Sequence, residues 1–115
     1  TTTTSPTSTT TTQTTTETFQ GTLNTTGAKT FPFIVQAAGT VTATLTTVSP
    51  DATVVIGLSL GTWNGTACQI VLANDNATQG TVVTGSVSAA GNLCARVYVG
   101  NLVDAVSFVV TVVHP

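Results

Sequence analysis

The sequence has almost no charge. Its 115 residues include two Lys or Arg and four Asp or Glu, together 5% of the chain, against about 25% in typical soluble domains. These residues are Glu17, Lys29, Asp51, Asp75, Arg96 and Asp104. Two basic side chains cannot form the positive surface that nucleic-acid binding requires, nor a polybasic membrane anchor. The composition therefore excludes a nucleic-acid partner and charge-based attachment to a membrane.

Metal ligands and long apolar runs are also scarce. The chain has two Cys and one His, which cannot form a Cys/His zinc site unless subunits share it. Apolar residues make up 41% of the chain, yet no run reaches the roughly 18 residues of a membrane helix. The longest candidate, 106–113, is broken by Ser107 and Thr111. We expect no metal, no cofactor and no membrane span.

Residues 1–18 form a tail of extreme composition. Thr occupies thirteen of these 18 positions and Ser two, interrupted by Pro6, Gln13 and Glu17. Such Ser/Thr-rich stretches are typical of O-glycosylated stalks. The candidate O-glycosylation sites are Thr1, Thr2, Thr3, Thr4, Ser5, Thr7, Ser8, Thr9, Thr10, Thr11, Thr12, Thr14, Thr15, Thr16 and Thr18.

Two interpretations of this tail remain open. It can serve as a glycosylated linker. Alternatively, its β-branched side chains favour extended backbone, and 18 extended residues reach roughly 60 Å. That is far enough to add a strand to the sheet of a neighbouring subunit.

Residues 19–115 form a body with the period-2 alternation of half-buried strands. Val41, Ala43 and Leu45, for example, alternate with Thr. We predict strands at 18–23, 29–36, 39–48, 53–60, 67–73, 81–88, 92–99 and 105–113. Seven or eight short strands at this spacing indicate an antiparallel β-sandwich, jelly-roll or Ig-like, rather than a closed barrel. Pro32 should place its strand at a sheet edge or give it a bulge.

Cys68 and Cys94 both fall in predicted strands, 26 positions apart. Two cysteines in a small exported all-β chain favour a disulfide. The sequence does not begin with Met, and we interpret it as a mature chain from which an export signal has been removed. The expected location is extracellular or on the cell surface.

Several segments resemble the bacterial pre-peptidase C-terminal (PPC) domain, a secreted β-sandwich module of jelly-roll type. Phe19-Gln20-Gly21-Thr22-Leu23 is similar to its opening Gly-x-Leu strand, and Phe31-Pro32-Phe33-Ile34-Val35 to its aromatic-rich strand. Ala38-Gly39-Thr40-Val41 and the ending Phe108-Val109-Val110-Thr111-Val112 also match. The acidic pair that usually follows is replaced by Thr53-Val54-Val55-Ile56. The resemblance implies a non-catalytic appendage and transfers no functional residue.

Few residues are candidates for chemistry, and we predict no catalytic residue. His114 is expected to be an exposed residue near the end of the chain. Asn74-Asp75-Asn76 suits a turn, or part of a calcium site with Asp51 or Asp104. Trp63 can pack in the core, pack on a subunit, or stack on a sugar. We expect Tyr98 to pack on a sheet with its hydroxyl satisfied. Candidate N-glycosylation sites in predicted turns are Asn24, Asn64 and Asn76.

These observations favour a structural protein. A surface with so few charges has little repulsion to keep monomers apart. We therefore predict a subunit of an extracellular filament or surface assembly that binds copies of itself through contacts that include the tail. The alternative is a secreted, non-catalytic, carbohydrate-binding module whose tail is a glycosylated linker. An enzyme is the least favoured class.

Overall fold

The computed structural model describes residues 14–24, 27–99 and 105–115. Within these residues the chain forms eight strands and no helix. The strands are β1 (Thr15–Leu23), β2 (Gly27–Val35), β3 (Gly39–Ser49), β4 (Ile56–Trp63), β5 (Cys68–Ala77), β6 (Val82–Val87), β7 (Gly91–Val99) and β8 (Val106–His114). The predicted all-β class is confirmed.

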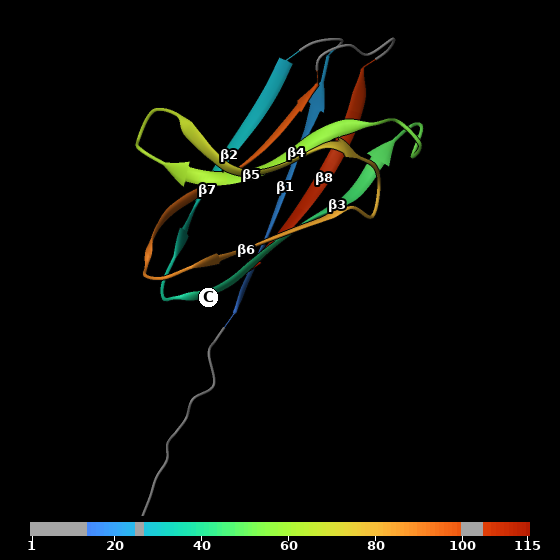
Figure 1. Cartoon of the computed structure of the whole chain (residues 1–115). Helices are drawn as coiled ribbons and strands as arrows, with labels where there is room; N and C mark the ends of the chain where they lie inside the picture. The colour runs from blue at the N-terminus through green and yellow to red at the C-terminus, as the bar shows by residue number, and fades with distance from the viewer. Residues whose placement is uncertain (1–13, 25–26, 100–104) are drawn as a thin grey trace, which may run out of the picture.

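The strands form two antiparallel sheets packed face to face (Figure 1). One sheet has the order β1-β8-β3-β6 and the other β2-β7-β4-β5. Every connection except the one between β4 and β5 passes from one sheet to the other. This is the arrangement of an eight-stranded jelly roll. It leaves four edge strands, with β1 and β2 on one side of the sandwich and β5 and β6 on the other.

Alternating side chains build the core, as the sequence pattern predicts. On β8, Val106, Phe108, Val110 and Val112 are buried, whereas the residues between them are exposed or half-buried. On β3, the buried residues that face the core include Val41, Ala43 and Leu45. Since strand side chains point alternately to the two faces, each sheet contributes one apolar layer to a shared core.

Three predicted strands have wrong boundaries. The strand predicted at 53–60 forms at Ile56–Trp63, because Thr53 and Val54 donate backbone hydrogen bonds to Asp51 in a turn. The first strand begins at Thr15 rather than 18, because Thr15 to Thr18 pair with β8 from His114 to Thr111. The predicted turn at Asn74-Asp75-Asn76 lies inside β5. Asn74 does bond to the backbone N–H of Asn76, at 2.9 Å. Pairing with β4 continues past this bond with a register shift between Ile56 and Leu58, so the local turn chemistry produces a bulge.

Pro32 lies on β2, which is an edge strand, as predicted. Pro has no N–H to donate to a ladder, and an edge strand needs fewer donors than a central one. On β8, Val109 and Val113 face away from the core and are half-buried. The outer surface of this sheet is therefore more apolar than a solvent-facing surface requires.

Candidate functional site

The β1/β2 side of the sandwich is closed by aromatic rings, apart from a hollow of about 380 Å³ beside Glu17, Phe33 and His114. The sequence contains four Phe, and all of them gather here. Phe19 stacks on Phe31 with ring centroids 4.9 Å apart, and Phe31 meets the edge of Phe108 at 5.9 Å. Phe33 lies 6.4 Å from Phe19. Such contacts stabilise beyond simple area burial, and they fill the space between the two edge strands.

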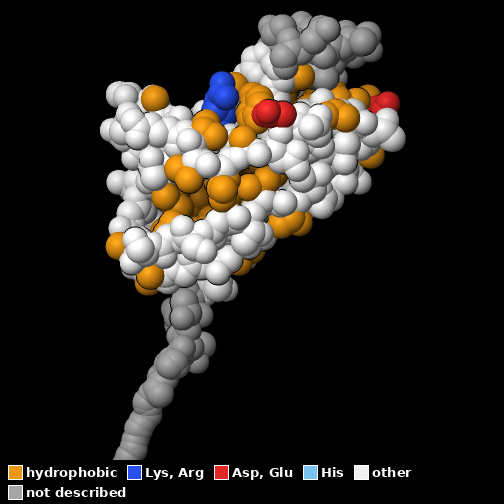
Figure 2. Space-filling model, viewed as in Figure 1, with side chains coloured by type: hydrophobic (Ala, Val, Ile, Leu, Met, Phe, Trp, Pro, Cys, Tyr) orange, Lys and Arg blue, Asp and Glu red, His pale blue; other side chains and the backbone are white. Residues whose placement is uncertain are grey.

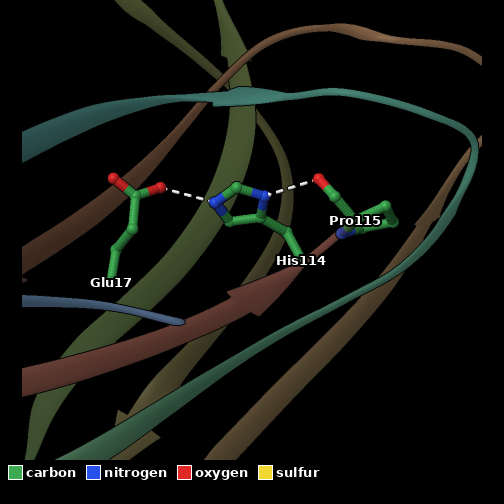
Figure 3. Close-up of polar contacts among 3 residues, drawn as sticks. All are labelled: Glu17, His114 and Pro115. Carbon is green, nitrogen blue, oxygen red and sulfur yellow. Dashed lines mark hydrogen bonds and ion pairs between the residues drawn. The ribbon is translucent and has the colours of Figure 1, made fainter. Parts of the chain in front are cut away.

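His114 extends this closed side and is buried, with 2% of its surface exposed. The prediction of an exposed His is therefore wrong. Its ring stacks on Phe33 at 5.0 Å. Its Nδ1 lies 2.9 Å from the backbone oxygen of Pro115, and its Nε2 lies 2.5 Å from Glu17 Oε2 (Figure 3). The His114 ring thus lies between two oxygen atoms that can accept hydrogen bonds.

The backbone oxygen of Pro115 also accepts a bond from the N–H of Gln36, at 3.1 Å. One chain of hydrogen bonds thus connects β1, β8 and the β2–β3 connection through Glu17, His114 and Pro115. The tail was expected to end at residue 18, yet Glu17 is part of this network. The arrangement holds strands together and presents no nucleophile.

The disulfide between Cys68 and Cys94 is confirmed, with an S–S distance of 2.02 Å and Cα atoms 5.8 Å apart. It joins β5 to β7, although β4 lies between them in the sheet. Gly61 on β4 makes this close approach possible, because a Cβ there would lie 2.1 Å from the backbone oxygen of Gln69. Trp63 is half-buried at the end of β4 and pairs with Cys68.

Tyr98 and Asp75 are joined by a hydrogen bond between β7 and β5. The hydroxyl of Tyr98 donates to Asp75, and Arg96 lies 5.2 Å from the Tyr98 ring. Burial first, and the bond to Asp75 second, raise the pKa of Tyr98 to about 12. Tyr98 packs over Gly57, where a Cβ would lie 2.1 Å from its ring. It is thus a packing residue with a satisfied hydroxyl, as predicted.

Two of the candidate calcium ligands, Asp51 and Asp75, accept hydrogen bonds from protein groups. Asp51 Oδ1 accepts from the backbone N–H and the hydroxyl of Thr53, which together lower the pKa of Asp51. Asp75 is bound to Tyr98 on another strand. In the described part of the chain, no group of three or more His, Cys, Asp or Glu side chains could hold a metal ion. Asp104 lies outside the described residues.

The candidate glycosylation sites are exposed wherever they are described. Of the tail sites, Thr14, Thr15, Thr16 and Thr18 lie within the described residues and are exposed; Thr1 to Thr12 lie outside them. Asn24 and Asn64 follow strand ends, and Asn76 lies within β5 rather than in the predicted turn. The side-chain oxygen of Asn64 accepts bonds from Thr66 and Ala67.

The β5/β6 side is open. Between these edge strands lies a cleft of about 420 Å³, and Figure 2 shows the hollow with apolar side chains gathered in it. Buried Val41 and Leu60 form its floor, and Val71 and Leu72 of β5 form one wall. Residues 85–92, from β6, the β6–β7 connection and the start of β7, form the other wall, and most of them are small. No charged residue lines the cleft.

The exposed apolar residues of β5 follow from a bulge. Leu60 pairs with Leu72 and Gly61 with Ile70, so Val71 is an extra residue in the β5 ladder. Ile70, Val71 and Leu72 are 43%, 68% and 37% exposed. Sequence reasoning missed this surface because it depends on how β5 and β6, which pair with different strands, approach each other in space.

No protein-family model matches the chain, and no curated protein matches its sequence. The resemblance to the PPC domain therefore stays an interpretation of sequence patterns. In the described residues, no helix has the length and apolar character needed to cross a membrane.

Proposed function

We propose that this protein is an exported, non-catalytic structural subunit that assembles with copies of itself into an extracellular filament or surface assembly. The subunit contacts include the Thr/Ser-rich tail. The observation that carries this proposal is the different protection of the two pairs of edge strands. An unprotected sheet edge is a template for pairing with another chain.

The β1/β2 edges carry residues that oppose strand addition. β1 has Glu17, and β2 has Lys29 and Pro32. Charged side chains and Pro are the usual means by which proteins prevent pairing at an edge. Contacts of the Phe19 ring with the rings of Phe31 and Phe33 also hold β1 against β2.

The β5/β6 edges have little of this protection. β6 contains no charged residue and no Pro. β5 has one charged residue, Asp75, which is bound to Tyr98. Its bulges disturb the ladder, yet three consecutive apolar side chains remain exposed beside the cleft. A subunit interface would bury this surface, whereas a monomer leaves it in water.

Composition and redox state support the same proposal. The net charge of −2 on 115 residues gives weak repulsion between copies. A disulfide persists in oxidising surroundings such as the outside of the cell, which is where we place the assembly. Sugars on the exposed tail residues would hydrate a surface that lacks charge.

The alternative function is a carbohydrate-binding module. It draws on the resemblance to the PPC domain and on half-exposed Trp63, which could stack on a sugar ring. We favour it less because the cleft has no aromatic lining residue. Stacking on aromatic faces is the main way in which a neutral site could hold a sugar.

The test is the oligomeric state of the purified, disulfide-bonded full chain. We expect sedimentation velocity to show concentration-dependent species larger than the monomer, and electron microscopy to show filaments or sheets. A protein that sediments as a monomer at all accessible concentrations, and binds immobilised polysaccharide, would support the binding module instead.

A further inference from the structure

We propose that the β5/β6 cleft is the acceptor site for the Thr/Ser-rich segment 1–13 of a second copy, which lies in it as an extended strand on the free edge of β6. This inference rests on the proposed function and names the two surfaces that meet. Three features support it: the free edge of β6, the residues that line the cleft, and the composition and length of segment 1–13.

The free edge of β6 is regular. β6 pairs with β3 in one unbroken register from Gly39 and Val87 to Thr44 and Val82, and it is the last strand of its sheet. The other edge of β6 therefore presents backbone donors and acceptors at normal strand spacing. β5 is a poorer template, because its ladder with β4 contains two register shifts. An incoming strand would pair with β6 and pack its side chains against Val71 and Leu72.

The lining selects for a strand with small, uncharged side chains. Gly85 is so close to β5 that a Cβ there would lie 2.7 Å from Leu72 Cδ1, so the cleft narrows at this point. Beyond this point the lining continues along small residues that include Ser86, Ser88 and Ala89. A charged occupant would lose hydration without gaining a partner. Thr offers a methyl group for the apolar walls and a hydroxyl for the polar groups of Ser86, Ser88 and Asn92.

Segment 1–13 has these properties. It contains no charged residue and no side chain larger than Gln. Fully extended, 13 residues span about 45 Å, more than the roughly 30 Å of a nine-residue strand. The segment joins β1 at the end of the sandwich where Thr15 pairs with His114. That end also holds Gly39, which pairs with Val87 of the cleft. One copy can therefore extend this segment beyond its own sandwich onto the next.

The first experiment is hydrogen exchange of the full, unglycosylated chain, measured on dispersed and assembled protein. We expect peptides covering 1–13 and 82–93 to gain protection together on assembly, whereas β2 peptides stay unchanged. If assemblies form with 1–13 protected while 82–93 exchanges freely, the tail binds another surface, so this inference is wrong and the proposed function stands. If assemblies form while 1–13 exchanges freely, this inference is wrong, and so is the tail contact in the proposed function. If the chain stays monomeric at every concentration, whether or not 1–13 is protected, both fail.

The second experiment places charge in the interface. Val71→Lys puts a cation on the cleft wall, and Thr9→Asp with Thr11→Asp puts anions on one face of the segment. Each should raise the concentration needed for assembly at least about tenfold, which corresponds to about 1.4 kcal/mol. The controls are Val55→Lys, an equally apolar residue that is 48% exposed outside the cleft, and Thr9→Ser with Thr11→Ser. Equal effects of variants and controls would overturn the inference.

Glycans provide a third test. A narrow cleft cannot hold a strand that carries sugars on its inward side chains. Because strand side chains alternate between two faces, we expect mass spectrometry of native assembled protein to find sugars within 1–13 only on alternate residues, those that face away from the cleft. Glycans on consecutive Thr residues along the whole segment would contradict insertion into the cleft.

Discussion

The two sides of this sandwich differ in what fills the space between the sheets. At the β1/β2 side, four Phe rings and the buried His114 fill it with side chains from the same chain. At the β5/β6 side, apolar residues of β5 and small residues of β6 and the β6–β7 connection line a cleft of about 420 Å³. Each side is formed by one edge strand from each sheet, so the difference lies in residue choice and in the register shifts of β5.

We expect the β1/β2 side to determine stability and the β5/β6 side to determine assembly. Residues at the closed side should control the free energy of unfolding, because they are buried against one another. Exposed residues at the open side, such as Val71, contribute little to folding and should control contacts between copies.

Phe108→Ala should destabilise the fold by about 3–5 kcal/mol, because it removes a ring that is 1% exposed and leaves a cavity. Val71→Ala, at 68% exposure, should change stability by less than about 0.5 kcal/mol. Urea denaturation of both variants measures this difference. Similar losses for the two would contradict the separation of the closed and open sides.

Reducing the disulfide should lower stability by about 3–4 kcal/mol, because it releases a loop of 26 residues in the unfolded chain. The bridge fixes β5, the strand that forms a wall of the open side, to β7. Denaturation with and without reductant gives the change, and alkylation before reduction should find no free thiol. If the reduced protein is as stable as the oxidised one, the disulfide is not needed to hold β5 to β7.

Gly61→Ala should destabilise by about 1–3 kcal/mol, the usual range for overpacking. The added Cβ would meet the backbone oxygen of Gln69 at 2.1 Å, and backbone cannot move aside as a side-chain tip can. The control is Gly91→Ala, where nothing lies within 4 Å. Thermal unfolding of the two variants should separate them clearly, and equal melting temperatures would refute the close approach of β4 and β5.

The single tyrosine offers a spectroscopic test. Its pKa is raised from 10.0 to about 12 by burial and by Asp75, so its stabilising contribution is complete below pH 10 and is lost as pH rises through 12. Ultraviolet absorbance should show ionisation near pH 12 in folded protein and near 10 in denaturant. Asp75→Asn should lower the folded value only in part, because burial is the larger cause. A pKa near 10 in the folded protein would mean that Tyr98 does not connect β7 to β5 through Asp75.

The sequence predicts the sandwich well because its apolar residues alternate with period 2. The face of β8 followed directly from Val106, Phe108, Val110 and Val112. The same alternation reaches His114 two residues later, and this signal could have placed its ring in the core. The rule that a lone His near a chain end is exposed gave the wrong result.

Other features have no local signal. Thr15 to Thr18 contain no apolar alternation, and they become a strand only through pairing with β8. Asn74-Asp75-Asn76 has turn chemistry that pairing with β4 overrides. The cleft arises where β5 of one sheet meets β6 of the other, a relation that neither segment encodes alone.

The most direct test of the account is a reconstruction of the assembled full chain by electron cryo-microscopy. We expect the reconstruction to show the β5/β6 cleft filled by a strand of a neighbouring copy and the β1/β2 edges facing solvent. Assemblies held together through β1 and β2, with the β5/β6 cleft open to water, would contradict it.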